Sequence, residues 1–273
     1  MSEPTVLVTV EDSVATVFLH RPHRYNAWTG RMHAEYKQAM NDLNTNSDIR
    51  AVVVTGSGST FCVGGDSEAL AGHADRGGYD PGQSVSVPNP GLHLRDEFNH
   101  DLAWHFGLRV PVIAAVNGAC AGIGLALTLF CDLRFVSATA KCTTAAPKLG
   151  LPAEYGMSWI LPRIIGVTRA NDVLLSGRVF TGDESRDWGL WNGVASDGAE
   201  ALHMATTWAH AVATTAGPRA VATTKGQIYA DLIRHGVGAS IDESISLIDE
   251  ATKTAEYREG VQALREKRPP RFS

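Results

Sequence analysis

Apolar side chains form short runs, or recur at helical spacing, along most of the chain. The segments whose pattern predicts strands are 6–10, 14–19, 51–55, 112–116 and 133–137. The segments whose pattern predicts helices are 32–43, 123–130, 171–176, 200–213, 219–233 and 240–256. Strands and helices alternate first and helices alone follow. This order predicts an α/β body at 1–200 and a helical region at 201–273.

One uncharged stretch, 110–131, is long enough to be a membrane span. It is interrupted by polar or helix-breaking residues, namely Pro111, Asn117, Gly118, Gly122 and Gly124. Such interruptions favour a buried strand, a tight turn and a buried helix. We therefore expect no membrane association.

Composition narrows the classes of function. The 273 residues are 44% hydrophobic and 19% charged, which excludes wholesale disorder. The net charge of −5 argues against a nucleic-acid partner, which requires a basic face. The four cysteines contain no C-x-x-C pair, so neither structural zinc nor a disulfide framework is expected. The N-terminus lacks a signal-peptide pattern, and we expect a cytoplasmic location and no bound metal.

Two glycine-rich turns, at 56–65 and 117–124, follow apolar strands. The first fails the dinucleotide-binding pattern because Phe61 replaces its third glycine, and the absence of any Gly-Lys pair excludes a Walker-type loop. The glycines could serve only to permit tight turns. Alternatively, the two turns could direct free backbone N–H groups toward one point, where they would stabilise negative charge on a substrate oxygen.

Cys120 lies in a G-x-C-x-G pattern between a strand and a helix, which has the form of a nucleophile elbow. The possible acid and histidine partners are Asp183, Asp197, His203, His210 and His235. A cysteine hydrolase is therefore one hypothesis. The residues favour the simpler interpretation that Cys120 is a small buried side chain.

Glu154 is flanked by the apolar or aromatic residues Leu151, Tyr155, Met157 and Trp159. A carboxyl group among such neighbours loses water, which raises its pKa and suits it to proton transfer. The alternative is a solvated glutamate in a turn.

A polar segment rich in glycine and proline, 71–92, is predicted to be a long surface loop, and such loops often cover binding sites. His93, His100 and His105 follow it and could face a site.

Taken together, these segments resemble the crotonase superfamily, the enoyl-CoA hydratase/isomerase group. The segments that carry the resemblance are Arg21-Pro22, Asn26-Ala27, 61–66, 111–118, Gly122-Ile123-Gly124, Cys131-Asp132, Leu161-Pro162-Arg163 and 259–272. The resemblance covers nearly the whole chain. It implies an α/β spiral of ββα units, followed by C-terminal helices at 201–273 that build homotrimers or dimers of trimers.

The resemblance also implies a chemistry, the stabilisation of a thioester enolate by two backbone N–H groups. The implied donors are those of Gly65 and Ile123, and the substrate is an acyl-CoA thioester, so that coenzyme A is part of the substrate and no separate cofactor is expected. Arg24 and Val63 would border coenzyme A together with Gly65 and Ile123, with Arg24 a candidate for its phosphates.

The chain departs from the hydratase pattern at two positions. Ala126 and Ala146 stand where a typical hydratase has two glutamates, and neither can move a proton. Glu154 falls where peroxisomal-type Δ3,Δ2-enoyl-CoA isomerases carry their single catalytic glutamate. We therefore favour double-bond isomerisation, because one carboxylate can remove a proton and return it elsewhere.

Three alternatives stay open. A hydratase could use a second group, for which the candidates are Asp96, Glu97, His100 and Asp101. The others are a thioesterase with Cys120 as nucleophile and a non-catalytic acyl-CoA-binding protein.

Overall fold

The structure is a computed structural model that describes residues 3–66, 88–234 and 236–272. Its strands are β1 (Val6–Glu11), β2 (Val14–Leu19), β3 (Ala51–Gly56), β4 (Thr60–Cys62), β5 (Val112–Val116), β6 (Ala119–Ala121), β7 (Leu133–Ser137), β8 (Lys141–Thr143), β9 (Phe180–Thr181) and β10 (Gly193–Ala195). Its α-helices are α1 (Gly30–Thr45), α3 (Ile123–Leu129), α4 (Met157–Ser176), α5 (Gly198–Thr215), α6 (Pro218–Leu232), α7 (Val237–Ala251) and α8 (Ala255–Glu266). Short 3-10 helices are η1 (Pro22–Arg24), η2 (Asp96–Phe98), η3 (Ala103–Gly107), η4 (Ala146–Leu149) and η5 (Arg186–Trp188).

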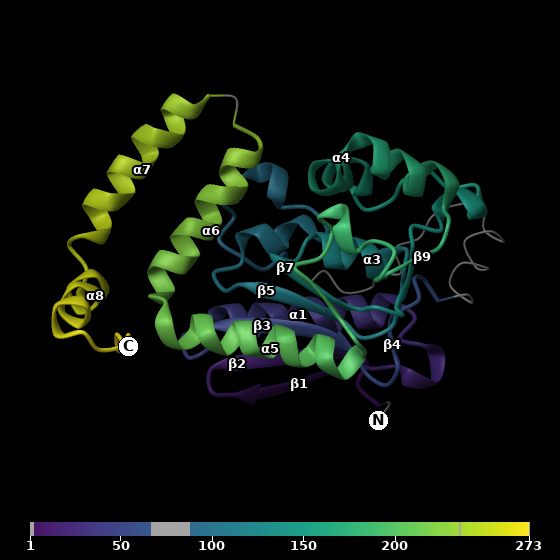
Figure 1. Cartoon of the computed structure of the whole chain (residues 1–273), viewed down its shortest axis with the longest axis horizontal. Helices are drawn as coiled ribbons and strands as arrows, with labels where there is room; N and C mark the ends of the chain where they lie inside the picture. The colour runs from purple at the N-terminus through teal and green to yellow at the C-terminus, as the bar shows by residue number, and fades with distance from the viewer. Residues whose placement is uncertain (1–2, 67–87, 235, 273) are drawn as a thin grey trace.

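The strands form two sheets. The larger has the order β1-β2-β3-β5-β7-β10 and the smaller β4-β6-β8-β9. In the pairs β3/β4, β5/β6 and β7/β8, the first strand joins the larger sheet and the second joins the smaller one. Helix α3 follows the second pair and α4 follows the third (Figure 1). The expected α/β spiral of ββα units is therefore confirmed.

Both faces of the central strands β3 and β5 of the larger sheet are covered, which explains why these two strands are apolar without alternation. Ala51 and Val53 of β3 share one cluster with Ala205 and Ala209 of α5. The intervening Val52 belongs to the main core, into which α1 also packs. A strand directs successive side chains to opposite faces, so both sets must be apolar.

The N-terminal predictions are confirmed. β1 and β2 form an antiparallel hairpin with Glu11 opposite Val14. Its two-residue loop, Asp12 and Ser13, has φ of 43° and 67°, the left-handed conformation that matches the twist of a hairpin. Helix α1 begins after Thr29, whose side chain accepts a hydrogen bond from the N–H of Met32 at 3.2 Å.

The uncharged stretch 110–131 contains β5, β6 and α3 and is no single helix. Among the described residues, no helix combines the length and the apolar character that crossing a bilayer requires. The predicted loop at 71–92 falls mainly outside the described residues.

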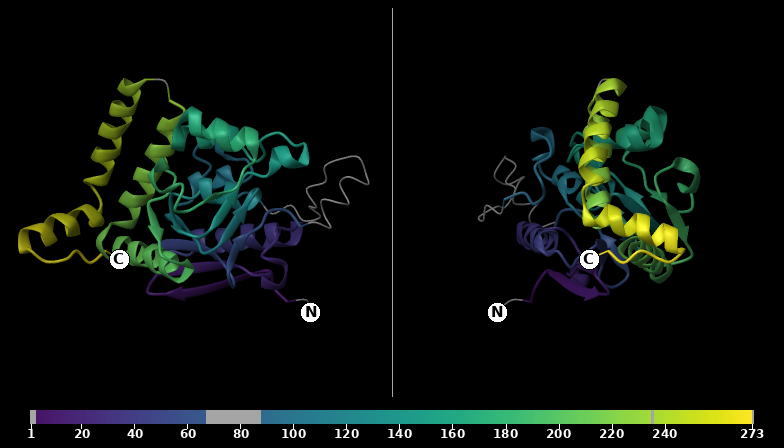
Figure 2. Two further views of the ribbon diagram at one scale, coloured as in Figure 1. Left: turned by 45° about the vertical axis from the view of Figure 1, so that its right-hand side comes forward. Right: turned by 90° about the vertical axis from the view of Figure 1, so that its left-hand side faces the viewer.

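The C-terminal region differs from its prediction in one respect. The helix expected at 240–256 is divided, because α7 ends at Ala251 and Thr254 caps α8 by accepting a hydrogen bond from the N–H of Tyr257 at 3.1 Å. Helix α5 begins at Gly198 and packs along the larger sheet. The helical region from 201 as a separate unit stays a prediction. Figure 2 shows α7 and α8 standing away from the body.

Helix α6 is joined to the body by a buried polar cluster around Asp132. The Nζ of Lys225 lies 2.7 Å from Oδ2 of Asp132 and donates to the carbonyl of Val110 at 2.9 Å. The hydroxyl of Tyr229 donates to Oδ1 of Asp132 at 2.7 Å. The ring of Tyr229 also stacks on Phe106, with 3.9 Å between centroids.

Candidate active site

The two glycine-rich turns meet at the carboxyl ends of β4 and β6, which are neighbouring parallel strands. A methyl group on Gly122 would lie 3.6 Å from Cα of Gly64, which is van der Waals contact. Gly64 and Gly122 have φ of +102° and +51°, a conformation that disfavours residues with a side chain. The next residues in the two turns, Gly65 and Ile123, are therefore brought close together.

The N–H groups of Gly65 and Ile123 are both left without an acceptor by the residues that the structure describes. The N–H of Trp28 donates to the carbonyl of Gly64 at 2.8 Å, and the N–H of Asp66 donates to the carbonyl of Trp28 at 3.0 Å. Backbone groups alternate in direction along an extended segment, so the N–H of Gly65 points away from Trp28. Ile123 is the first residue of α3, where N–H groups lack an intrahelical acceptor. Within the described ranges, neither N–H has a hydrogen-bond acceptor.

Glu154 lies in the turn between η4 and α4 and is half-buried. Burial raises the pKa of its carboxyl group above the ordinary value, as the sequence predicted. No hydrogen bond or ion pair joins this carboxylate to another residue that the structure describes, so desolvation is the cause of the shift. A carboxyl group with a raised pKa is better able to exchange protons near neutral pH.

The turn that carries Glu154 packs beside α3. A methyl group on Gly156 would lie 3.4 Å from Cζ of Phe130, which caps the C-terminal end of α3. The free N–H of Ile123 lies at the other end of the same helix. Seven helical residues span roughly 10 Å, so α3 links the two candidate groups through a short, fully buried element.

Alanine occupies the two positions where the resemblance places hydratase glutamates. Ala126 is fully buried one turn after Ile123, and Ala146 is buried at the start of η4. The four candidates for a second acid or base, Asp96, Glu97, His100 and Asp101, are all exposed. Asp101 lies 3.4 Å from Nε2 of His33. Among the described residues, no hydrogen bond or ion pair joins any of these four side chains to Glu154.

Arg24 and Val63 flank the Gly65 turn. Nη2 of Arg24 lies 3.1 Å from Oδ1 of Asp66, and Nη1 of Arg21 lies 2.9 Å from Oδ2 of the same carboxylate. The Asp66 side chain is only 5% exposed and directly follows Gly65, so these pairs tie η1 to the turn. Val63 is exposed. Asp66 is not among the candidates that the sequence singles out, because its arginine partners lie 45 and 42 positions earlier and only the fold brings them together.

Cys120 does not have the environment of a nucleophile. It lies in β6, is fully buried, and burial raises the pKa of its thiol well above the ordinary value. Of the proposed partners, His203 and His210 lie on α5, which covers the larger sheet, whereas Cys120 belongs to the smaller one. Asp183 and Asp197 are exposed, and His235 lies outside the described residues. The structure therefore favours the interpretation of Cys120 as a packing residue.

The three histidines after the loop differ in their surroundings. His93 and His100 are exposed. His105 is completely buried, and burial lowers its pKa to about 3. Across the described part of the chain, no group of three or more His, Cys, Asp and Glu residues is arranged to hold a metal ion.

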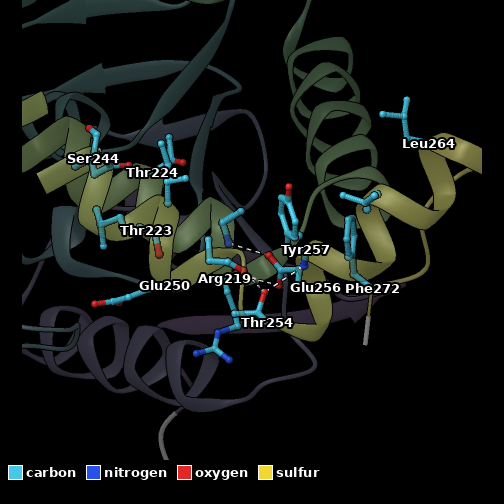
Figure 3. A pocket seen from close by; sticks show the side chains of 18 residues that line it. Arg219, Thr223, Thr224, Ser244, Glu250, Thr254, Glu256, Tyr257, Leu264 and Phe272 are labelled. Carbon is cyan, nitrogen blue, oxygen red and sulfur yellow. Dashed lines mark hydrogen bonds between the residues drawn. The ribbon is translucent and has the colours of Figure 1, made fainter. Parts of the chain in front are cut away.

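A groove of about 680 Å³ lies among α6, α7 and α8 (Figure 3). Glu256 is one of the lining residues, and its carboxylate accepts hydrogen bonds from the N–H groups of Arg219 at 3.1 Å and Ala220 at 2.9 Å. The lining includes Thr223, Tyr257 and Leu264 but none of the candidate site residues. The groove is thus separate from the turns at Gly65 and Ile123.

A family model described as "Enoyl-CoA hydratase/isomerase" matches residues 9–273. The chain belongs to the enoyl-CoA hydratase/isomerase family. It is 31% identical to 1,2-epoxyphenylacetyl-CoA isomerase of Escherichia coli (strain K12), with 98% of each chain covered. It is 33% identical to a probable enoyl-CoA hydratase of Rhodobacter capsulatus, with 100% of this chain and 99% of the relative covered.

Solved structures agree with this family assignment. A probable enoyl-CoA hydratase/isomerase from Mycobacterium abscessus superimposes with a TM-score of 0.85 at 27% identity over 98% of both chains. An enoyl-CoA hydratase from Mycobacterium tuberculosis H37Rv also gives 0.85, at 26% identity over 99% of both chains. The protein is therefore an acyl-CoA enzyme of the hydratase/isomerase type.

Proposed function

We propose that this family member shifts the double bond of an enoyl-CoA thioester. In this proposal the thioester carbonyl accepts hydrogen bonds from the N–H groups of Gly65 and Ile123, and Glu154 moves the proton. The observation that carries the proposal is a pair of N–H groups that follow two adjacent parallel strands and have no acceptor in the described part of the chain. Fixed N–H donors aimed at a developing oxyanion stabilise an enolate more than the ground state.

A single carboxylate is enough to remove the proton and to return it. Glu154 removes a proton from the carbon next to the thioester of a 3-enoyl-CoA, and the electron pair moves onto the carbonyl oxygen as a dienolate. The same carboxyl group then returns the proton two carbons further along the acyl chain. The double bond moves into conjugation, and Glu154 ends as a carboxylate. The raised pKa of Glu154 supports both steps.

Two buried alanines favour isomerisation over hydration. Addition of water requires a group that holds and deprotonates the water in addition to the acid that protonates carbon. Ala126 and Ala146 supply neither. One relative is named an isomerase and another a probable hydratase, so these names alone leave both reactions open.

The decisive variant is Glu154→Gln, assayed on a 3-enoyl-CoA. We expect kcat to fall by about 10²–10⁴, which is the usual contribution of a positioned base. Glu184→Gln, which alters an exposed carboxylate paired with Arg178, is the matched control and should leave turnover unchanged. If Glu154→Gln retains kcat within a few-fold of the parent, Glu154 is not the proton carrier.

Hydration is tested separately in water labelled with a heavy oxygen isotope. An isomerase converts the 3-enoyl-CoA to the conjugated product without taking label into the acyl chain. Rapid formation of labelled 3-hydroxyacyl-CoA from a 2-enoyl-CoA would instead show that a second group activates water.

We propose further that Arg24 and Val63 border coenzyme A beside the Gly65 turn, with Arg24 close to its phosphates. The support is the link between Arg24 and Asp66, which keeps the guanidinium next to the turn while its side chain stays 35% exposed.

We also propose that copies of this chain cover the C-terminal helices as homotrimers or dimers of trimers. The support is a set of large apolar side chains that are exposed on α6, α7 and α8. They are Ile228, Leu232, Ile241, Ile245, Ile248, Tyr257 and Leu264. Exposed apolar side chains gathered on neighbouring helices are typical of a surface that another protein covers.

A further inference from the structure

The position of the Gly65 N–H depends on Trp28. Two hydrogen bonds join the backbone of Trp28 to the residues on either side of Gly65, at 2.8 Å to the carbonyl of Gly64 and at 3.0 Å from the N–H of Asp66. The segment pairs with Trp28 as an isolated bridge and not as a long strand. Among the described residues, the backbone of 64–66 makes no other backbone hydrogen bond, so a displacement of the Trp28 backbone is transmitted to the Gly65 N–H.

The ring of Trp28 is itself held by α1. It is 7% exposed and meets the ring of Tyr36 edge to face, with 5.7 Å between centroids. His33 of the same helix contacts it in a similar way at 6.0 Å. Such edge-to-face contacts have a preferred geometry. The location of the Trp28 ring therefore follows the location of Tyr36.

Tyr36 is in turn fixed to η3 by a buried hydrogen bond. Its hydroxyl lies 2.8 Å from Nε2 of His105, and Nδ1 of His105 lies 2.5 Å from the carbonyl of Leu102. A carbonyl can only accept, so Nδ1 carries the proton and Nε2 accepts from the Tyr36 hydroxyl. Burial lowers the pKa of His105 and raises that of Tyr36, which keeps both groups neutral. Trp104 stacks on the His105 ring at 3.9 Å.

The Tyr36–His105 hydrogen bond fixes the position of α1 against η3 more closely than apolar packing alone would. Tyr36 and His105 are both buried, and a buried polar group is costly unless its hydrogen bonds are made. The bond satisfies one register of α1 against η3 and penalises others, whereas apolar side chains would tolerate small shifts. The path from this bond to the candidate site is short, through one ring contact between Tyr36 and Trp28 and one backbone pair between Trp28 and Gly65.

We infer that the Tyr36–His105 hydrogen bond sets the position of the Gly65 N–H through the ring and backbone of Trp28. Trp28, Tyr36 and His105 are thus positioning residues for the N–H pair, and none of them touches the reacting atoms. This inference rests on the proposed role of Gly65 and Ile123 and does not depend on the role of Glu154.

The test measures how strongly the bound thioester carbonyl is polarised. Hexanoyl-CoA, labelled with a heavy carbon isotope at the carbonyl, is bound to the full-length protein. The lowering of the C=O stretching frequency on binding, here called the carbonyl shift, is recorded by difference infrared spectroscopy. Hexanoyl-CoA has no double bond to move, so the measurement needs no turnover.

The test variant is Tyr36→Phe, which removes only the hydroxyl. We expect it to lose part of the carbonyl shift and to lower kcat about tenfold with KM within about twofold, because loss of a whole oxyanion donor costs about 10²–10³. Tyr229→Phe is the matched control. It also loses one hydroxyl, from the half-buried Tyr229, which donates to Asp132 at 2.7 Å, and it should keep both the carbonyl shift and kcat.

Two outcomes would overturn the inference. One is a Tyr36→Phe enzyme with the parental carbonyl shift and kcat, and the other is equal loss in Tyr36→Phe and Tyr229→Phe, which would indicate general destabilisation. Trp28→Phe is the second variant if Tyr36→Phe folds poorly. It shortens the ring that meets Tyr36, and it should lose the carbonyl shift in the same direction.

The same measurement separates this inference from the proposed function. Glu154→Gln should lose turnover and keep the carbonyl shift. Retained turnover in Glu154→Gln would refute only the role of Glu154. Absence of any carbonyl shift in the parent would refute the N–H pair, and the inference with it.

Discussion

The strand body and the C-terminal helices of this protein are stabilised in different ways. All six residues of β3 are buried, and its two faces meet different apolar clusters. In α7, by contrast, none of the described side chains is buried, and α8 buries only Ala263. The body therefore has a core of its own, whereas α7 and α8 expose apolar side chains that a monomer cannot cover.

This contrast shows why the candidate chemistry resides in the body. Two N–H groups can stabilise charge only if they are held in place before the substrate arrives. Parallel strands inside a packed core hold them, and exposed helices cannot. The cluster of Asp132, Lys225 and Tyr229 is where the two regions meet, and it offers the strongest way to disturb their relationship.

The largest change in unfolding free energy is expected from a substitution at this junction. Lys225→Met leaves the carboxylate of Asp132 without its cation, although the two side chains are only 6% and 13% exposed. Removing one partner of a buried pair costs about 3–5 kcal/mol of unfolding free energy. Urea unfolding measures this loss. Lys253→Met is the control, because its pair with Asp249 is 68% and 69% exposed and such pairs contribute about 0–1 kcal/mol. Similar losses in both variants would contradict a buried junction.

A smaller loss of unfolding free energy is expected when the pH is lowered. The pKa of His105 is about 3 in the folded body against 6.5 for the free side chain, so the unfolded chain binds more protons between these values. The stability is therefore complete above pH 6.5 and falls as the pH decreases toward 3, by at most about 1.4 kcal/mol per unit.

Glu259 of α8 responds at lower pH. Hydrogen bonds from Arg268 lower the pKa of Glu259 from 4.5 to about 2, so its contribution is present above pH 4.5 and is lost as the pH falls toward 2. Acid near pH 5.5 should thus weaken the body before it affects this pair. Urea unfolding between pH 7 and 5 measures the slope, which His105→Phe should reduce. The remaining slope belongs to groups such as His33, whose pKa burial also lowers. An unchanged slope in His105→Phe would contradict the assignment.

The smallest change in unfolding free energy is expected on α7. Ile245 is 62% exposed, so Ile245→Ser should alter the stability of the single chain by no more than about 0.5 kcal/mol. If another copy covers this face, the same change removes apolar contact and shifts the protein to smaller species in sedimentation velocity. Leu175→Ser, at 76% exposure on α4, is the control and should leave the assembly unchanged. Equal behaviour of the two variants would refute the proposed interface on α7.

Local patterns predicted much of the body. The hairpin, α1 and the buried strands follow from side-chain periodicity, because a strand repeats every two residues and a helix every 3.6 residues. The division of the predicted helix 240–256 was missed, since Thr254 is one of several polar residues there and its capping role depends on the backbone. The repeat of strand pairs was expected only from the family resemblance, because each unit differs in length and composition and leaves no fixed period in the sequence.

The sequence alone determined which chemistry the site lacks. Alanine at 126 and 146 removes two carboxylates in any fold, and glycine at 64 and 122 permits turns that other residues disfavour. Only the tertiary structure decided that the N–H groups of Gly65 and Ile123 find no acceptor among the described residues, because pairing depends on which backbone lies alongside. It likewise decided the raised pKa of Glu154 and the buried bond between Tyr36 and His105. Access to water and contacts between distant segments are properties of the packed chain, and no local run of residues contains them.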